Sequence, residues 1–373
     1  MRELYKLELV RLVKELGNLE GLYIDQFYEL GKDRFRFRVS GKGEKANLNC
    51  VLPYSMNRTD LVEVREDATN FTIAVRNRIA GSKIKSIGLL NDDRIILVSL
   101  ESKGEETKLI LEMFGRGNMI IADSDMKIKL AYHNHDFADR SVRPGAVYMP
   151  PKNSSINAFD NKELAELEEE LKLAEGKDAQ LANYLNKRVG LGKMYVEEAI
   201  AMSKVDANSK IGDIGLDDYG SIFKNIKGVI DTCIETPQFL VYYKNGEMAN
   251  FSMCSISRYA ELESKKFESL EETLEFVYRN IGEAKQEKNE DEEKTVASIE
   301  KQMIILNDID AEIKSNREMA DYVMKNMHEL NGIIDAARSN KGISVDGLKR
   351  ISKRIEILSI SMKTKSIRIK TEQ

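Results

Sequence analysis

The stretch NDDRIILVSL, from Asn91 to Leu100, places an adjacent acid–base pair, Asp93-Arg94, directly before a strand-like apolar run. Such a pair at the start of a strand is common, so its meaning depends on its neighbours. The helix-like FTIAVRNRIAGSKI (Phe71–Ile84) precedes it, and the strand-like KLILEMFGRGNMIIAD and the turn-rich RSVRPGAVYMPP follow it. In that ordered setting, we interpret the pair as part of an RNA-facing surface.

The composition predicts a soluble globular protein without a membrane partner. The chain has 373 residues, enough for two or three domains, and 32% of them are charged. It has no apolar run near 18 residues, and its N-terminus, MRELYKLELVRLVKELG, is amphipathic rather than signal-like. The net charge of −5 argues against general nucleic-acid affinity but leaves room for a local basic patch.

The cysteines and histidines do not predict a disulfide framework or a metal site. The three cysteines, Cys50, Cys233 and Cys254, form no CxxC pair, which indicates a reducing, cytoplasmic setting. The run from His133 to Asp136 has no third partner in view and is interpreted as a polar loop. Since no nucleophile elbow, Walker loop, HExxH or kinase motif occurs, we expect no catalytic residue, no metal and no cofactor.

Hydrophobic periodicity predicts an α+β fold with a β-rich N-terminal domain, a helix-hairpin-helix module and a long helical coiled-coil arm. Residues 1–155 form the β-rich domain, residues 160–231 the helix-hairpin-helix module, and residues 232–261 a β-hairpin that returns to the N-domain. Its turn is expected at Asn245-Gly246. Residues 262–340 are assigned to the coiled coil and residues 341–373 to a basic middle segment, which we expect to be truncated.

The predicted coiled coil rests on an alternating 4–3 spacing of apolar residues that polar residues interrupt. A helix over 294–338 would be about 65 Å long. The sequence leaves open whether this arm pairs with a second copy in a dimer or with a helix that the chain does not contain. The apolar members are Ile299, Met303, Leu306, Ile313, Ala320, Met324, Met327 and Ile334, and the interruptions are Asp310, Arg317 and Asn331.

Alternation in KDRFRFRVSG puts two phenylalanines on one face of a strand and three arginines on the other. Same-face residues lie roughly 7 Å apart, close to the spacing of phosphates along a nucleic-acid strand. The arginines therefore either follow an RNA backbone or form the solvated face of a hairpin. They are Arg34, Arg36 and Arg38, and the phenylalanines are Phe35 and Phe37.

Two further basic segments are candidates for phosphate binding. Arg76, Arg78, Lys83 and Lys85 surround the C-terminus of the helix expected at 71–80, where positive charge also suits the helix dipole. The segment VGLGKMYVEEAI fits a helix-hairpin-helix turn whose glycines let backbone amides approach a phosphate, although a turn without a ligand has the same pattern. Its candidate residues are Lys187, Arg188, Gly190, Gly192 and Lys193.

These motifs, taken in order, resemble the NFACT family, which includes the nuclear export mediator factor and bacterial proteins similar to fibronectin-binding protein A. The resemblance covers essentially the whole chain. It rests on five short motifs. They are Glu8 with Glu15-Leu16 and Gly21; Phe71 with Arg76 and Ile79; Asp93-Arg94; Glu112 with Gly115, Gly117 and Asn118; and Arg143, Pro144, Gly145, Tyr148, Pro150 and Pro151.

The resemblance implies a role in ribosome-associated quality control. Family members bind the large ribosomal subunit with a stalled nascent chain still linked to tRNA. They recruit charged tRNA, in many lineages alanyl-tRNA, for template-free C-terminal tailing, while the ribosome itself makes the peptide bond. Carried over by motif, Asp93, Arg94 and Arg76 would bind tRNA, with Glu8 as the acidic neighbour of the pair.

The chain departs from the family pattern at two positions and in length. The family more often has aspartate at the position of Glu8 and lysine at that of Asn77, which weakens inference about tRNA choice. A second coil helix and the C-terminal RNA-binding domain are missing. From the sequence, we expect a truncated chain or a split gene.

Two alternatives belong to other functional classes. A DNA-binding or repair protein of formamidopyrimidine-glycosylase-like architecture would also pair a β-rich domain with a helix-turn module. However, those enzymes use an N-terminal proline, and this chain begins Met1-Arg2-Glu3. A coiled-coil scaffold or surface adhesin is the second alternative, against which the absence of an export signal argues.

Overall fold

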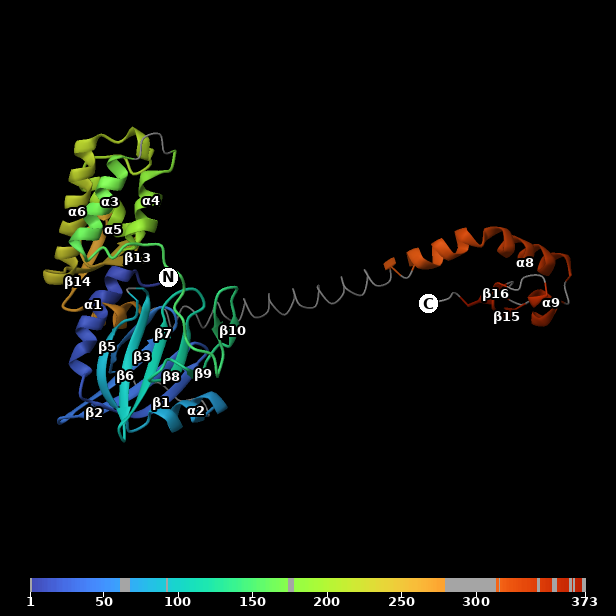
Figure 1. Ribbon diagram of the computed structural model, residues 1–373, viewed down its shortest axis with the longest axis horizontal. Helices are drawn as coiled ribbons and strands as arrows, with labels where there is room; N and C mark the ends of the chain where they lie inside the picture. Colours follow the sequence, from blue (N-terminus) through green and yellow to red (C-terminus); the bar gives the residue numbers. More distant parts are fainter. Residues whose placement is uncertain are drawn as a thin grey trace. The chain divides into compact units, whose positions relative to one another are not determined.

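The computed structural model describes residues 2–60, 68–91, 93–173, 178–278, 313–314, 316–340, 343–350, 354–361, 364 and 366–370. The chain divides into two compact units, Met1–Ile281 and Gly282–Gln373. The predicted segments up to residue 261 therefore lie within one unit, which is mixed α/β and built on a large antiparallel sheet (Figure 1).

Nine antiparallel strands form the sheet of the first unit, in the order β4-β3-β2-β1-β5-β6-β7-β8-β9. Neighbours in sequence are neighbours in space except where β1 pairs with β5. Strands β2 and β3 pair as a hairpin, with Lys42 and Gly43 between them. The strands are β1 Tyr23–Gly31, β2 Arg34–Gly41, β3 Glu44–Val51, β4 Ser55–Thr59, β5 Lys83–Leu89, β6 Ile95–Ser102, β7 Glu105–Glu112, β8 Asn118–Asp123 and β9 Ile128–Ala131.

Helix α1 (Lys6–Leu16) joins the sheet to the rest of the unit. Its leucines, among them Leu7, Leu12 and Leu16, are fully buried in the main hydrophobic core. Helix α2 (Asn70–Ile79) begins at a cap where the Thr69 hydroxyl accepts from the Thr72 amide, and it ends just before Gly81, as predicted. A short 3-10 turn follows α1, and a small two-stranded sheet follows β9. These are η1 Gly17–Leu19, β10 His135–Asp136 and β11 Ser141–Val142.

Helices α3 to α6 and a three-stranded sheet follow in the first unit, with these helices grouped at one end of the large sheet and α2 at the other (Figure 1). The predicted hairpin turns at Asn245-Gly246, where both residues have positive φ, and a third strand pairs with it. These elements are α3 Asn161–Lys172, α4 Leu181–Val189, α5 Lys193–Met202, η2 Ile211–Asp213, α6 Leu216–Glu235, β12 Phe239–Lys244, β13 Glu247–Ser252, η3 Ser257–Tyr259 and β14 Glu263–Phe267.

A helix at 270–278 returns from this small sheet to the edge of the large one. Glu15 of α1 accepts hydrogen bonds from the backbone amides of Leu270 and Glu271 at its N-terminus. Glu275 then accepts from the side chains of Asn57 and Thr59 on β4. The chain after the hairpin thus contacts both α1 and the large sheet, whereas the sequence assigned these residues to the start of the coiled coil.

The second unit has its own small core of Ile333, Leu348, Ile355 and Ile357. It contains α8 Met327–Ser339, α9 Val345–Lys349 and the hairpin of β15 Ile357–Ser361 and β16 Ser366–Ile369. Residues 279–312 of the predicted coiled coil lie outside the described residues. Within the described part of that seam, Met324, Met327 and Ile334 are exposed. No helix in the described parts of the chain is long and apolar enough to cross a membrane.

Candidate functional site

The Asp93-Arg94 pair lies in the turn between β5 and β6. Two backbone hydrogen bonds fix this turn, from the Leu90 amide to the Ile95 carbonyl and from the Met113 amide to the Arg94 carbonyl, each 2.8 Å long. The Asp93 carboxylate accepts from the backbone amide of Arg94 at 2.6 Å. Asp93 therefore stabilises the turn through the Arg94 backbone. The Arg94 guanidinium is not paired with Asp93 and extends away from the turn to another partner.

The Arg94 guanidinium forms an ion pair with Glu3, an acidic residue that the sequence did not single out. Its Nη1 donates to Glu3 Oε2 at 2.5 Å, and the backbone amide of Gly115 donates to Glu3 Oε1 at 2.9 Å. The side chains of Arg94 and Glu3 are 35% and 31% exposed. Solvent therefore reaches both partners, and the pair is presented at the surface.

The turn between β7 and β8 completes this site. Phe114, Gly115 and Arg116 occupy the turn, and the Arg94 guanidinium carbon lies 5.7 Å from the centre of the Phe114 ring. Arg116 is exposed and forms no hydrogen bond or ion pair with the residues that the structure describes. Two cationic side chains thus lie at the same end of the strands, and Glu3 accepts hydrogen bonds there from Arg94 and from the Gly115 amide. We call Glu3, Arg94, Gly115 and Arg116 the Arg94 site.

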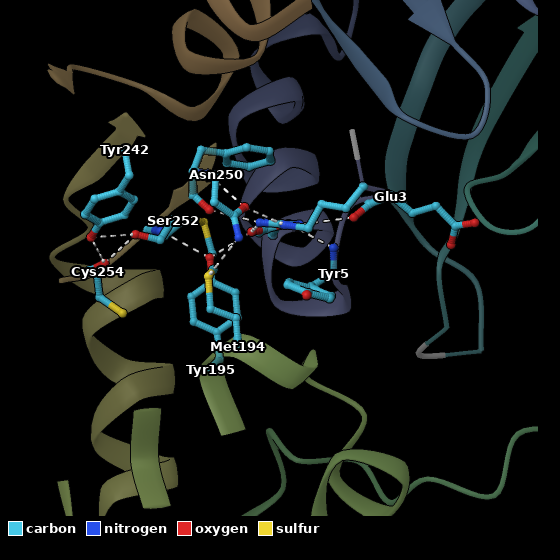
Figure 2. Close-up of polar contacts among 12 residues, drawn as sticks. Glu3, Tyr5, Met194, Tyr195, Tyr242, Asn250, Ser252 and Cys254 are labelled. Carbon is cyan, nitrogen blue, oxygen red and sulfur yellow. Dashed lines mark hydrogen bonds and ion pairs between the residues drawn. The ribbon is translucent and has the colours of Figure 1, made fainter. Parts of the chain in front are cut away.

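Glu8 lies in a different, buried network, which also includes Tyr5 and Tyr195 (both labelled in Figure 2). Both its oxygens accept from the Arg2 guanidinium, at 2.6 and 2.7 Å, and it also accepts from the Tyr195 hydroxyl at 2.9 Å and the Tyr5 amide at 2.8 Å. Burial would lower the pKa of Arg2, but the Glu8 carboxylate outweighs that effect and raises it. Burial is also the main cause of the raised pKa of Tyr195.

This network corrects the prediction that Glu8 is the acidic neighbour of Asp93-Arg94. The Glu8 side chain has no exposed surface, and the carboxylate that contacts Arg94 belongs to Glu3. Arg2 also donates to the side chain of Asn250 and the carbonyl of Phe251 on β13. The Arg2–Glu8 pair therefore connects the start of α1 with α5 and the small sheet. A direct contact between Glu8 and tRNA stays a prediction, and the free protein offers no surface for it.

Arg76 lies in a third location, on the outer side of β1. Its Nε donates to the carbonyl of Phe27 at 2.8 Å, and its guanidinium lies 5.5 Å from the Tyr28 ring. Arg36 approaches the same ring at 4.8 Å. The described contacts of Arg76 are thus with β1, whereas those of Arg94 are with Glu3 and Phe114, so the two arginines have no contact partner in common.

The predicted row of three solvated arginines on β2 is wrong at its centre. Phe35 and Phe37 are buried as expected, but Arg36 is only 2% exposed, and its Nε and Nη1 have no hydrogen-bond partner. Arg34 is partly buried and has an interaction partner, while Arg38 is exposed at 3.8 Å from Asp25. Three adjacent guanidiniums following one RNA backbone would require Arg36 at the surface.

The α4–α5 turn contains the predicted glycines, but packing accounts for the second of them. Gly190 ends α4 in the left-handed region, at φ 68°, and Gly192 precedes α5 at φ 119°. Gly192 is buried, and a Cβ atom there would lie 2.2 Å from the Tyr5 ring. Phosphate binding by Gly190 and Gly192 stays a prediction. The structure supplies a different reason for Gly192, which is the close approach of α1.

The basic residues of this turn differ in their availability. Arg188 is held by Glu170 and by the Tyr184 hydroxyl, and Lys193 lies 3.5 Å from Glu197. Lys187 is exposed. The only one of the three that is free to meet a phosphate without breaking an ion pair seen in the described residues is therefore Lys187.

Histidine at the start of the predicted polar loop pairs with an aspartate rather than with other ligands. His133 Nε2 lies 3.3 Å from Asp33, and the Asn118 amide bonds reciprocally with the His133 backbone. Among the described residues, no group of three or more histidine, cysteine, aspartate or glutamate side chains is placed to hold a metal ion.

Fold and site together define a mixed α/β protein in which an antiparallel sheet carries a cationic turn and leads into a helical module. The family model described as NFACT N-terminal and middle domains matches residues 6–340. The chain therefore belongs to the NFACT family, as its motifs predicted.

Curated relatives share the family but are longer. The chain is 21% identical over 277 residues to the archaeal Rqc2 homologue aRqcH of Methanocaldococcus jannaschii, covering 72% of this chain and 41% of that protein. It is 28% identical over 160 residues to the Rqc2 homologue RqcH of Streptococcus suis, covering 38% and 29%. A Drosophila melanogaster relative, 26% identical over 31% of this chain and 12% of its own length, is named as the ribosome quality control complex subunit NEMF homologue. The chain thus spans less than half the length of these relatives, whose names place the family in ribosome quality control.

Solved structures show the same fold. The fibrinogen binding protein from Staphylococcus aureus aligns with a TM-score of 0.61 at 20% identity, covering 74% of this chain and 98% of that one. The N-terminal part of the fibronectin/fibrinogen-binding protein from Streptococcus suis aligns with a TM-score of 0.58 at 21% identity, covering 74% and 99%. At this level of identity, the likeness concerns the fold alone.

Proposed function

We propose that this chain acts in ribosome-associated quality control as a tRNA-recruiting factor. It would bind the large ribosomal subunit carrying a stalled nascent chain linked to tRNA, and deliver charged tRNA, with alanyl-tRNA the first to test, for template-free C-terminal tailing. On this proposal the protein is a cytoplasmic RNA-binding factor and not an enzyme, because the ribosome makes the peptide bond. Family membership over residues 6–340 supports the setting.

The observation that carries the proposal is the partial exposure of the Arg94 guanidinium, which is paired with Glu3 at the end of the strands. It lies at the surface beside the Phe114 ring and next to the exposed Arg116. A planar guanidinium binds phosphate and also stacks on a base, and single-stranded loops of RNA offer both. Asp93 fixes the turn from which Arg94 extends.

The remaining elements would extend the contact with the ribosome. We infer that α4 and α5 act as a helix-hairpin-helix module that meets RNA phosphates through Lys187. We also infer that the helical residues 316–325 and α8 belong to a coiled coil. The arm would reach across the ribosome and position the N-terminal unit on tRNA. A dimer through this coil belongs to the same proposal.

Substitution of Arg94 by alanine tests the proposal. We expect Arg94→Ala to reduce tRNA affinity at least about tenfold, because a charge-assisted phosphate contact is lost, while the melting temperature stays within about 2 °C. Filter binding with the full chain measures the affinity, and circular dichroism measures melting. The control is Lys14→Ala. Lys14 lies in the last turn of α1 and forms an exposed ion pair with Glu235, so this variant also removes one cation. Unaltered tRNA affinity in a folded Arg94→Ala protein would refute the role.

A further inference from the structure

The Glu3 carboxylate occupies a point where donors from two different turns converge. Arg94 Nη1 donates to one of its oxygens, and the Gly115 amide donates to the other. A guanidinium and a backbone N–H are common donors to the oxygens of a nucleic-acid phosphate. Because a phosphodiester also presents two adjacent anionic oxygens, it can take both hydrogen bonds that Glu3 now accepts.

The surroundings of Glu3 allow an incoming anion to approach. Gly115 is exposed at φ 60°, and nothing lies within 4 Å of the position that a Cβ atom would occupy there. Arg116 follows it with an exposed side chain that is unpaired within the described chain. Positive charge and an uncrowded, exposed stretch of backbone therefore lie beside the Glu3 carboxylate.

The backbone of Glu3 is held while its side chain remains free to move. Arg2, the residue before it, is anchored by both oxygens of Glu8 and also donates to the Glu3 carbonyl at 3.1 Å. Figure 2 shows the Glu3 carboxylate directed away from this buried network. Since the Glu3 side chain is 31% exposed, it can leave Arg94 without disturbing the core.

We propose that the Arg94 guanidinium and the Gly115 amide form an anion site for an RNA phosphate, and that Glu3 occupies this site as an internal competitor until RNA displaces it. The inference rests on the proposed function, because it assumes that RNA binds at Arg94. The displaced anion is the Glu3 carboxylate, and the displacing anion is the RNA phosphate. Binding of Glu3 lowers the fraction of molecules that can accept RNA, and the apparent affinity falls by the same factor. Half-exposed ion pairs are weak, so this factor is expected to be about three- to tenfold.

The test compares Glu3→Gln, Arg94→Ala and the double variant in the full chain. Anisotropy of fluorescently labelled deacylated tRNA measures affinity. We expect Glu3→Gln to tighten binding about three- to tenfold, and to have no such effect when Arg94 is already alanine. Glu106→Gln is the matched control, because Glu106 pairs with Lys108 at 2.6 Å at the opposite end of β7 and carries the same charge. It should change tRNA affinity less than about twofold, because salt screens the effect of a negative charge that is lost far from the site.

Opposite outcomes separate a competitor from a positioning residue. If Glu3 merely orients Arg94, Glu3→Gln weakens tRNA binding as Arg94→Ala does, and the proposal is overturned. Unchanged affinity in Glu3→Gln overturns it as well and leaves the tRNA-binding role standing.

Inorganic phosphate distinguishes failure of this inference from failure of the proposed function. The glycine amides of the ¹⁵N-labelled full chain report binding at Gly115. If no variant binds tRNA but phosphate shifts the Gly115 signal in Glu3→Gln, and not in the double variant, the anion site stands and the tRNA role falls. If phosphate leaves Gly115 unshifted in Glu3→Gln, the anion site is overturned.

Discussion

Glu3 and Glu8 are both paired with arginine, yet their surroundings give them different roles. The Glu3 side chain is 31% exposed and can exchange its partners with solvent or a ligand. Glu8 accepts from four donors and is fully buried, so its charge is compensated only inside the protein. We therefore assign Glu3 to ligand binding and Glu8 to the folding of the first unit.

Replacing Glu8 by glutamine tests this assignment at the scale of one residue. We expect Glu8→Gln to lower the free energy of unfolding by about 2–4 kcal/mol, because Arg2 would keep a charge without its buried partner. Urea denaturation measures the loss. Glu101→Gln serves as the control, since its exposed pair with Lys85 is screened by solvent and should contribute little to stability. A Glu8→Gln protein of unchanged stability that no longer binds tRNA would instead support a direct role for Glu8 in recognition.

The residues of the Arg94 site were only partly predictable from the sequence. Asp93 and Arg94 could be found because they adjoin a recognisable strand and match a family motif. Glu3 could not, since its contact with Arg94 spans 91 positions and depends on how the N-terminus crosses the sheet. Arg36 was misassigned because alternation identifies the two faces of a strand without showing whether another element covers one of them.

At the scale of elements, the sequence motif predicted the conformation of the α4–α5 turn but not the packing contact that requires it. The pattern of glycines predicted a tight interhelical turn, and the structure has it. The sequence could not show that the Tyr5 ring lies against Gly192, because this contact joins α1 to a turn nearly two hundred positions away. Likewise, Glu112 and Tyr148, from two separate family motifs, form a buried hydrogen bond of 3.0 Å.

A glycine-to-alanine comparison tests the packing role of this turn. We expect Gly192→Ala to lower the free energy of unfolding by at least about 2 kcal/mol, because its Cβ atom would collide with Tyr5 and its φ of 119° is strained for alanine. Gly228→Ala, inside α6 with open space around the new atom, should instead raise it by about 0.5–1 kcal/mol. Chemical denaturation of both variants measures the difference. Equal effects would show that Tyr5 does not constrain the turn.

The whole molecule consists of two units whose cores differ greatly in size. The core of the first unit extends from α1 and the large sheet through α3–α6 to the small sheet, whereas four buried residues form the centre of the second. The sequence located the change from sheet-rich to helical segments but could not show that the predicted segments up to residue 261 share one core. Long-range contacts such as those of Glu15 with the helix at 270–278 join them.

Unequal cores predict separate melting of the two units. We expect calorimetry of the full chain to show two transitions, with the second unit unfolding first, because a small core buries too little apolar surface to offset its chain entropy by a wide margin. A fragment of residues 1–281 should then reproduce the upper transition alone, within about 2 °C. A single cooperative transition, or a fragment that melts well below the full chain, would mean that the second unit stabilises the first, and the Arg94 site would have to be studied as part of a larger cooperative structure.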